Sequence, residues 1–295
     1  MTAMTAVWGS TFFLIKDVLE SLPSADFLAV RFWVAAVVLL AVLWPQTRRL
    51  DARDRRRGAV LGGLYAVAQL LQTEGLATTA ASVSGFVTGL YVVLTPVLAA
   101  VLLRQRTPAS TWVAVAVATV GLGVLSLRGL AAGAGELMTL AAAAVYALHI
   151  VLLGRWSRPS TALGLSSVQM VVIAVVCTLA ALPGGVEPPR GGAAWTAVLY
   201  MALVAGAGAL VVQTWAQAHM SATRAAVVMT TEPVFAALFA VLFGGEVLGP
   251  RVLVGGTLVL VAMYVVELVP RRRDPARAGA LAVDDPPAEA LHHEP

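Results

Sequence analysis

Runs of apolar residues, separated by short breaks of charged, proline or glycine residues, fill most of the chain. They lie at residues 2–20, 27–44, 58–78, 83–103, 110–127, 135–153, 162–182, 194–216, 224–243 and 250–269. Each run is close to the ~20 residues with which a helix crosses the hydrocarbon core of a bilayer. The pattern predicts an all-α membrane protein of ten transmembrane helices, in which short connections make neighbouring helices antiparallel.

The composition supports this prediction and narrows the function. The 295-residue chain is 59% hydrophobic and 12% charged, whereas about a quarter of the residues in a soluble domain are charged. Zinc-ligand spacings, phosphate loops and nucleophile elbows are missing from the sequence, so we expect no enzyme activity, cofactor or metal site. The arginine-rich stretches lack interleaved aromatic residues, and a membrane explains them better than nucleic acid does. The lone cysteine, Cys177, has no partner for an internal disulfide.

The loop arginines indicate an orientation. With the N-terminus inside, three loop arginines lie outside, at Arg128, Arg190 and Arg251, against fifteen inside. The fifteen are Arg48, Arg49, Arg53, Arg55, Arg56, Arg57, Arg104, Arg106, Arg155, Arg158, Arg224, Arg271, Arg272, Arg273 and Arg277. The positive-inside rule therefore predicts cytoplasmic N- and C-termini. Residues 270–295, rich in proline and acidic residues, are expected to form a disordered cytoplasmic tail.

The second half of the chain repeats the first at an interval of roughly 138 residues. The matching segments are "AVWGST" (6–11) with "AVYALH" (144–149), "QTEGLATTAASVSG" (72–85) with "QTWAQAHMSATRAA" (213–226), and "TPVLAAVLL" (95–103) with "EPVFAALFA" (232–240). We expect repeats at 1–128 and 129–269. Five spans is an odd number, so the second repeat is inverted relative to the first, as in many secondary transporters.

A proline occupies the same place in the fourth span of each repeat, at Pro96 and Pro233. Because proline removes a backbone hydrogen bond and bends a helix, we expect paired kinks beside a cavity at the repeat interface. The glycines of "GFVTG" (85–89) are spaced for close helix packing.

Several segments resemble the EamA-type branch of the drug/metabolite transporter superfamily. They are "WGSTFFLIK", "RF" at 31–32, "TGLYVVLTPVLAAVLL" and "TTEPVFAALFAVLFGGEVL". The resemblance covers about residues 5–269 and implies a ten-helix, two-repeat fold that moves small metabolites, often outward. The family often has a glutamate after the fourth helix of each repeat. This chain keeps it as Glu246 and has Gln105 at the first site.

Glu232 is the most informative charged residue, because a carboxylate inside a span is costly. It either faces a cavity, where it binds a cationic group or a proton, or satisfies backbone groups freed by Pro233. His149 lies near the centre of its span and is either part of a proton relay or a hydrogen-bonded packing residue. Arg31 lies near the outer end of its span, where the simplest interpretation is a side chain that snorkels to the surface, and Glu74 marks either an outer vestibule or a solvated helix end.

Uncharged polar and aromatic residues on several spans predict a cavity for a small amphipathic solute, although they would equally serve interhelical hydrogen bonds. With the two residues above, the predicted substrate cavity comprises Ser10, Thr11, Gln72, Thr88, Tyr91, Tyr146, His149, Gln213, Trp215 and Glu232.

Together these features predict a secondary transporter of small metabolites in the inner membrane, with export of an amino acid or related compound as the first hypothesis. An importing permease for a sugar-like solute is the alternative, and a receptor or membrane scaffold is the competing class. The expected partners are a small-molecule metabolite and the lipid bilayer. Nucleic acid is not expected, and proton coupling and a homodimer stay open.

Overall fold

Helices form almost all of the computed structural model, which describes residues 2–103, 109–128, 131–219 and 228–268. The elements are α1 (Thr2–Leu19), α2 (Ser24–Arg48), α3 (Ala52–Thr78), α4 (Ala81–Gly89), α5 (Tyr91–Leu103), α6 (Ala109–Ser126), α7 (Ala134–Trp156), α8 (Ala162–Ala181), the 3-10 turn η1 (Leu182–Gly184), α9 (Gly192–Tyr200), the π-helical η2 (Met201–Gly208), α10 (Ala209–His219), α12 (Glu232–Leu242) and α13 (Pro250–Leu268). Strands β1 (Leu127–Arg128) and β2 (Ala131–Ala132) form a short antiparallel hairpin between α6 and α7.

The described helices make ten spans when α4 and α5 are counted as one and α9, η2 and α10 as another. Five of these are long and apolar enough to cross a bilayer, and α6, α12 and α13 are shorter apolar helices. The other two, α1 and α3, carry charged residues near one end or both. The predicted all-α fold is therefore confirmed.

Interruptions divide the fourth span of each repeat, but they do not lie at the prolines. Leu90 separates α4 from α5, whereas Pro96 lies inside α5. In the second repeat, α12 follows a turn at Thr230 and Thr231, and Pro233 lies in its first turn. A proline is tolerated there because its missing N–H would have no partner within the helix.

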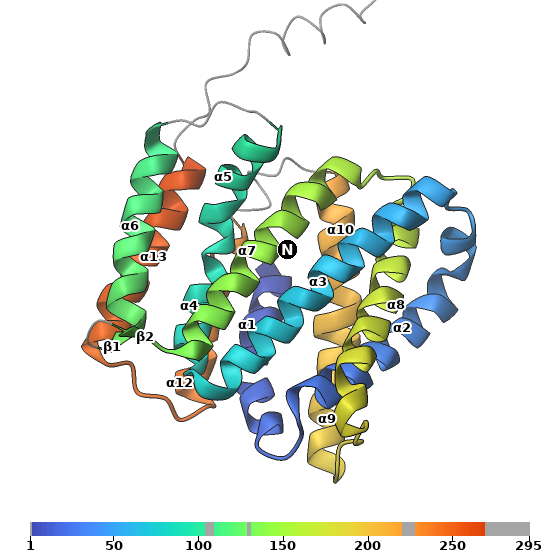
Figure 1. Cartoon of the computed structure of the whole chain (residues 1–295), viewed down its shortest axis with the longest axis horizontal. Helices are drawn as coiled ribbons and strands as arrows, with labels where there is room; N and C mark the ends of the chain where they lie inside the picture. The colour runs from blue at the N-terminus through green and yellow to red at the C-terminus, as the bar shows by residue number, and fades with distance from the viewer. Residues whose placement is uncertain (1, 104–108, 129–130, 220–227, 269–295) are drawn as a thin grey trace, which may run out of the picture.

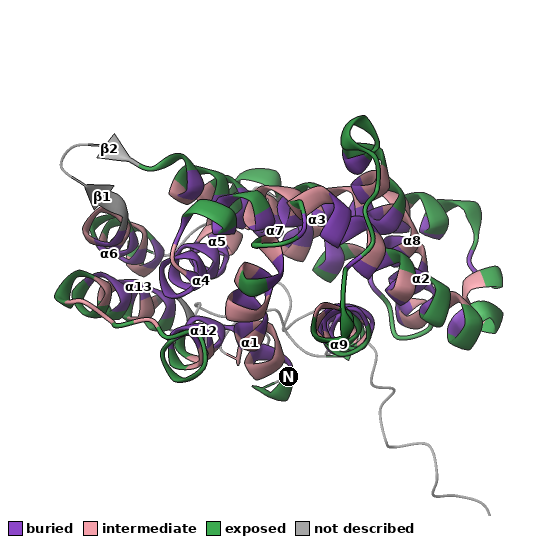
Figure 2. Cartoon of the chain, turned by 90° about the horizontal axis from the view of Figure 1, so that it is seen from below, coloured by how far each residue is buried: buried purple, intermediate pink, exposed green. Residues whose placement is uncertain are grey.

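The spans stand in two rows, which Figure 2 shows nearly end-on. One row holds α6, α5, α7, α3 and α8, and the other holds α13, α12, α1, α9 and α2. Each row mixes helices of both repeats, and counterparts face each other across the rows. At the flanks these counterparts pack extensively, α6 on α13 and α2 on α8, and α4 packs on α12. The central counterparts, α7 with α1 and α3 with α9–α10, make far less contact.

Glycines let the helices on one side of the centre approach closely. A Cβ atom on Gly9 of α1 would lie 2.5 Å from the Cβ atom of Phe235 in α12. On α4, a Cβ atom at Gly85 would lie 2.5 Å from the Cβ atom of Ala236, and one at Gly89 would lie 2.5 Å from a ring carbon of Pro233. The "GFVTG" glycines thus serve close packing, and α12 is held between α1 and α4.

Large apolar side chains cover the outside of the described structure. Trp44, Trp112, Val120 and Leu179 are each more than half exposed, and Figure 2 shows exposed residues along the outer faces of both rows. In water such a surface would promote aggregation. In a bilayer it is the expected contact with lipid.

Candidate functional site

A cavity of about 50 Å³ lies where the central helices of the two rows meet. The lining residues are Trp8, Thr11, Phe12 and Ile15 of α1, Arg31 of α2, Tyr65, Gln69, Gln72, Thr73 and Leu76 of α3, Thr88 and Tyr91 of the divided fourth span, Tyr146 and Ile150 of α7, Gln213 of α10, and Met229 and Glu232 at the start of the ninth span. Both repeats contribute, and the interruptions of both fourth spans lie at its wall.

Glu232 meets Tyr91 inside this cavity. The Tyr91 hydroxyl donates to Oε2 of Glu232 at 2.7 Å, and both residues are buried. Each stands at the beginning of a helix, Tyr91 in α5 and Glu232 in α12. The positive end of the α12 dipole stabilises a carboxylate in the first turn. The bond joins the two repeats.

Tyr146, whose ring lies edge-on to that of Tyr91 with centroids 6.4 Å apart, organises a chain of hydrogen bonds. Its hydroxyl accepts from Nε2 of Gln69 at 2.6 Å and donates to Oε1 of Gln72 at 2.9 Å. Nε2 of Gln72 then donates to Oγ1 of Thr88 at 3.1 Å. The Tyr65 ring lies edge-on to the Tyr146 ring, with centroids 5.5 Å apart. These contacts fix polar groups of α3, α4 and α7 relative to one another.

Arg31 also lines the cavity, which corrects the prediction that it snorkels to the surface. Its residue is 2% exposed, and its guanidinium lies over the rings of Phe27 and Phe32, 5.6 Å and 4.9 Å from their centroids. Nε donates to the carbonyl oxygen of Met201, the first residue of η2, at 3.2 Å. Among the described residues, Nη1 is buried without a hydrogen-bond partner.

The predicted site residues divide into two groups. Seven of them line the cavity, namely Thr11, Gln72, Thr88, Tyr91, Tyr146, Gln213 and Glu232.

Three predicted residues lie elsewhere. Ser10 bonds to the Tyr200 hydroxyl at 2.8 Å. His149 is fully buried and pairs through Nε2 with Oε1 of Gln169 at 2.9 Å. Trp215 is half exposed on α10.

Several lining residues carry buried polar atoms that lack a partner in the described part of the chain. Besides Nη1 of Arg31 they are Oε1 of Gln69, Oγ1 of Thr73 and Oε1 of Gln213. An unsatisfied buried polar group costs about 1–3 kcal/mol. Residues of the cavity wall therefore contain polar atoms, one of them cationic, that are buried without a partner in the described structure.

At the end of α3 where α4 begins, Glu246 joins the repeats. Its carboxylate accepts from the backbone N–H of Ala81 at 2.6 Å, and from the N–H and hydroxyl of Ser82 at 3.2 and 2.6 Å. It thereby caps the first turn of α4 from the loop that follows α12. The corresponding Gln105 lies outside the described residues, as do Arg224 and the predicted tail at 270–295. Glu74, at the same end, is exposed and accepts from the Ser24 hydroxyl.

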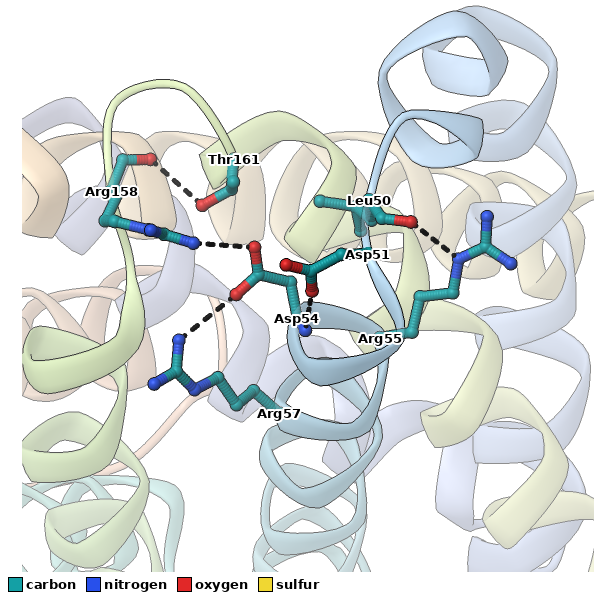
Figure 3. A network of polar contacts seen from close by, with 7 residues as sticks. All are labelled: Leu50, Asp51, Asp54, Arg55, Arg57, Arg158 and Thr161. Atoms are coloured by element: carbon teal, nitrogen blue, oxygen red, sulfur yellow. Dashed lines mark hydrogen bonds and ion pairs between the residues drawn. The ribbon is translucent and has the colours of Figure 1, made fainter.

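At the other end of α3, Asp54 forms a second link between the repeats (Figure 3). It receives Nη2 of Arg158, from the α7–α8 connection, at 2.7 Å and Nη1 of Arg57 at 3.1 Å. Asp51 caps the same helix by accepting from the backbone N–H of Asp54 at 2.6 Å. Part of the arginine-rich segment at the start of α3 therefore helps to hold the two repeats together.

The sequence matches the EamA-like transporter family twice, over residues 1–127 and 133–268. The chain belongs to this family. It is therefore a multi-pass membrane transporter and not an enzyme, with ten transmembrane helices in two inverted repeats, and it acts on a small-molecule substrate.

Similar proteins agree with this assignment. An "Uncharacterized transporter" of Archaeoglobus fulgidus is 29% identical over 269 residues, which span 91% of this chain and 84% of that protein. The "Uncharacterized inner membrane transporter YedA" of Escherichia coli K12 is 26% identical over 257 residues, or 83% of this chain and 82% of its own. A crystal structure of another protein shares the fold with a TM-score of 0.65 over 92% of this chain and 97% of its own, at 18% identity.

Proposed function

We propose that the protein is a secondary transporter of the inner membrane that exports amino acids or closely related metabolites by alternating access. The observation that carries this proposal is the cavity itself, which is small, has both polar and apolar lining residues, and is walled by both repeats at their divided helices. Discontinuous helices around a site between inverted repeats are typical of such transporters.

The unequal packing of the central helices supports alternating access. Helix α3 packs along α7, whereas their counterparts, the span α9–η2–α10 and α1, pack together less extensively. Inverted repeats give the opposite arrangement when the two halves exchange conformations, and the cavity then opens to the other side. In this proposal residues 1–128 and 129–269 are the exchanging units, both termini are cytoplasmic, and an ion or solute gradient supplies the energy.

Counterflow in proteoliposomes tests the proposal. Vesicles loaded with a millimolar amino acid and diluted into a trace of the labelled compound should accumulate label only when the protein is present. A Thr88→Trp variant, which fills the cavity, is the matched control and should be inactive. A receptor or scaffold would give no counterflow for any solute.

Direction needs a separate measurement. Overproduction should protect cells against growth inhibition by an amino-acid analogue and lower its intracellular concentration, because export removes it. Sensitisation of the cells would instead indicate an importing permease.

A further inference from the structure

Arginines gather where α2 ends and α3 begins. Residues 48–57 contain six arginines and two aspartates, a formal net charge of +4. Both aspartates are engaged, since Asp51 accepts from the backbone N–H of Asp54, and Asp54 pairs with Arg57 and Arg158. Four exposed arginine side chains have neither an ion pair nor a hydrogen bond within the part of the chain that the structure describes. These corner arginines are Arg48, Arg49, Arg53 and Arg56.

Arg55 holds this corner in a defined shape. Its Nε donates to the carbonyl oxygen of Leu50 at 3.1 Å (Figure 3), and its Nη2 donates to that of Arg48 at 3.1 Å. Carbonyl groups at the end of α2, which have no partner within the helix, thus receive a donor from the start of α3. The corner arginines are therefore carried on backbone that is tied together on both sides of the connection.

The position of these charges is unfavourable for α3 by itself. The N-terminus of a helix carries the positive end of its dipole, so cations close to it lower helix stability. Arg53, Arg55 and Arg56 all lie within the first five residues of α3. An anionic group beside the corner would interact favourably both with the arginines and with the helix terminus. The local electrostatics therefore favour an anion at this place.

Exposed apolar side chains continue from the corner along both helices. On α2, Trp44 lies one turn before Arg48 and is 56% exposed, and Val42 beside it is 66% exposed. On α3, the exposed Val60 and Val67 follow the corner arginines at helical spacing. Tryptophan is enriched at the boundary between lipid headgroups and hydrocarbon. The arginines therefore lie at the headgroup level, and the valines lie where acyl chains pass.

The corresponding corner of the second repeat shows that the fold does not need this charge. It lies between α8 and α9, at residues 182–191, and contains a single arginine, Arg190, which pairs with Glu187 at 3.0 Å. Because the repeats are inverted, that corner lies on the opposite side of the membrane. The unpaired arginines thus belong to one side only.

We propose that the α2–α3 corner binds an anionic phospholipid. The phosphate lies against the corner arginines and the N-terminus of α3, and the acyl chains lie along the exposed valines of α2 and α3. Clusters of four or more arginines next to a transmembrane helix are typical of sites for anionic lipids. The lipid binds beside the Asp54–Arg158 link between the repeats, and its binding is independent of which solute the protein transports.

The test compares lipids that differ only in headgroup charge. The purified full chain in a neutral detergent is given phosphatidylglycerol or phosphatidylcholine with the same acyl chains. Bound lipid is counted by native mass spectrometry, and the unfolding temperature is measured in the same samples. Phosphatidylglycerol should bind more tightly and raise the unfolding temperature further. The difference should shrink when the salt concentration reaches about 0.5 M, because salt screens exposed charges.

Paired substitutions locate the site. Arg53→Gln with Arg56→Gln should weaken phosphatidylglycerol binding about 25-fold, since each arginine near the surface contributes roughly fivefold in affinity. Four arginines remain in the segment to maintain the orientation. Arg53→Lys with Arg56→Lys keeps both charges and should bind within about twofold of the wild type, because lysine also binds phosphate. Arg190→Gln, at the exposed corner of the other repeat, should match the wild type.

Three results would overturn the proposal. Equal binding of the two lipids by the wild type excludes recognition of the headgroup charge. Phosphatidylglycerol binding that is unchanged in the glutamine pair, or lost equally in the lysine pair, shows that the charges of the corner do not hold the lipid. A full rise in unfolding temperature with glycerol phosphate alone, which has the phosphate without acyl chains, identifies a site for soluble anions instead.

Discussion

Glu232 and Tyr91 are bonded across the repeat interface, and a conformational change between the repeats would have to strain or break their bond. The carboxylate is buried, and the cavity that it lines carries polar, aromatic and aliphatic side chains. Removing its charge while keeping its shape therefore separates a binding role from a purely structural one.

We expect Glu232→Gln to lower counterflow and gradient-driven transport together, by about tenfold or more, because a cationic group of the proposed substrate would lose its charged acceptor. Glutamine preserves an acceptor for the Tyr91 hydroxyl, so expression and thermal stability should change little. Both rates are measured in the same proteoliposome preparation, with Glu74→Gln as the control on an exposed glutamate.

Other outcomes would assign Glu232 differently. If gradient-driven transport fails while exchange survives, Glu232 carries a coupling proton. If both activities persist, the residue only holds Tyr91 and the start of α12 in place.

Some cavity residues can be predicted from the sequence and others cannot, and individual side chains show why. Glu232, Gln72 and Gln213 stand out because a polar group within an apolar run needs a partner or water. Arg31 is missed because a cation near a span end reads as a snorkelling side chain, and its inward direction depends on the rotation of α2 against its neighbours. The His149–Gln169 pair joins α7 to α8, so no local pattern distinguishes it from a cavity residue.

At the scale of the element, the close crossing of α1 on α12 depends on one missing side chain. Gly9→Ala should destabilise the protein by about 1–3 kcal/mol, the usual cost of overpacking, because its Cβ atom would also lie 2.8 Å from the backbone nitrogen of Ala236. Thermal unfolding in detergent measures the effect.

Gly63→Ala on α3 is the matched control, because a Cβ atom there meets nothing within 4 Å. It should be neutral or raise stability by about 0.5–1 kcal/mol through helix propensity. Equal effects of the two substitutions would show that the α1–α12 contact relaxes without cost.

The helices were predictable from the sequence to a greater degree than their interruptions. An apolar run gives the position of a span, but Leu90 and the π-helical stretch Met201–Gly208 lie in runs that contain no charged residue. Side chains of other helices stabilise the π-helical stretch by donating hydrogen bonds to its carbonyl oxygens. Nε1 of Trp8 donates to the oxygen of Ala205, and Nε of Arg31 donates to the oxygen of Met201. Tertiary contacts of this kind are not encoded in local periodicity.

At the scale of the whole molecule, the Glu246 contacts close the repeats together at one end. Weakening them with Glu246→Gln should let that end open more often, because charge-assisted bonds to Ala81 and Ser82 are replaced by weaker neutral ones. A cysteine at Leu76, which lines the cavity, should then react about tenfold faster with a membrane-impermeant maleimide, for a loss of about 1.4 kcal/mol.

The only native cysteine, Cys177, is buried and gives little background labelling. Glu187→Gln is the control on an exposed carboxylate. A lower unfolding temperature with unchanged labelling would mean that Glu246 caps α4 without acting as a gate.

The orientation of the whole bundle is a further prediction. Reporter fusions at Gln46 and at Pro295 should both report the cytoplasm, because fifteen of eighteen loop arginines fall on that side. An external signal at either position contradicts the proposed orientation, and opposite signals at the two positions contradict an even number of spans between them.

The packing of helices on their distant counterparts also constrains biogenesis. Helix α1 is stabilised by α12, and Thr5 bonds Thr231 at 2.8 Å. Similarly, α2 rests on α8 and α6 on α13. When the first five spans leave the ribosome, their partners have not yet been synthesised, and polar side chains such as Gln69 and Gln72 have no cavity to face. We therefore expect the first five spans to complete their packing only after the second five have been synthesised.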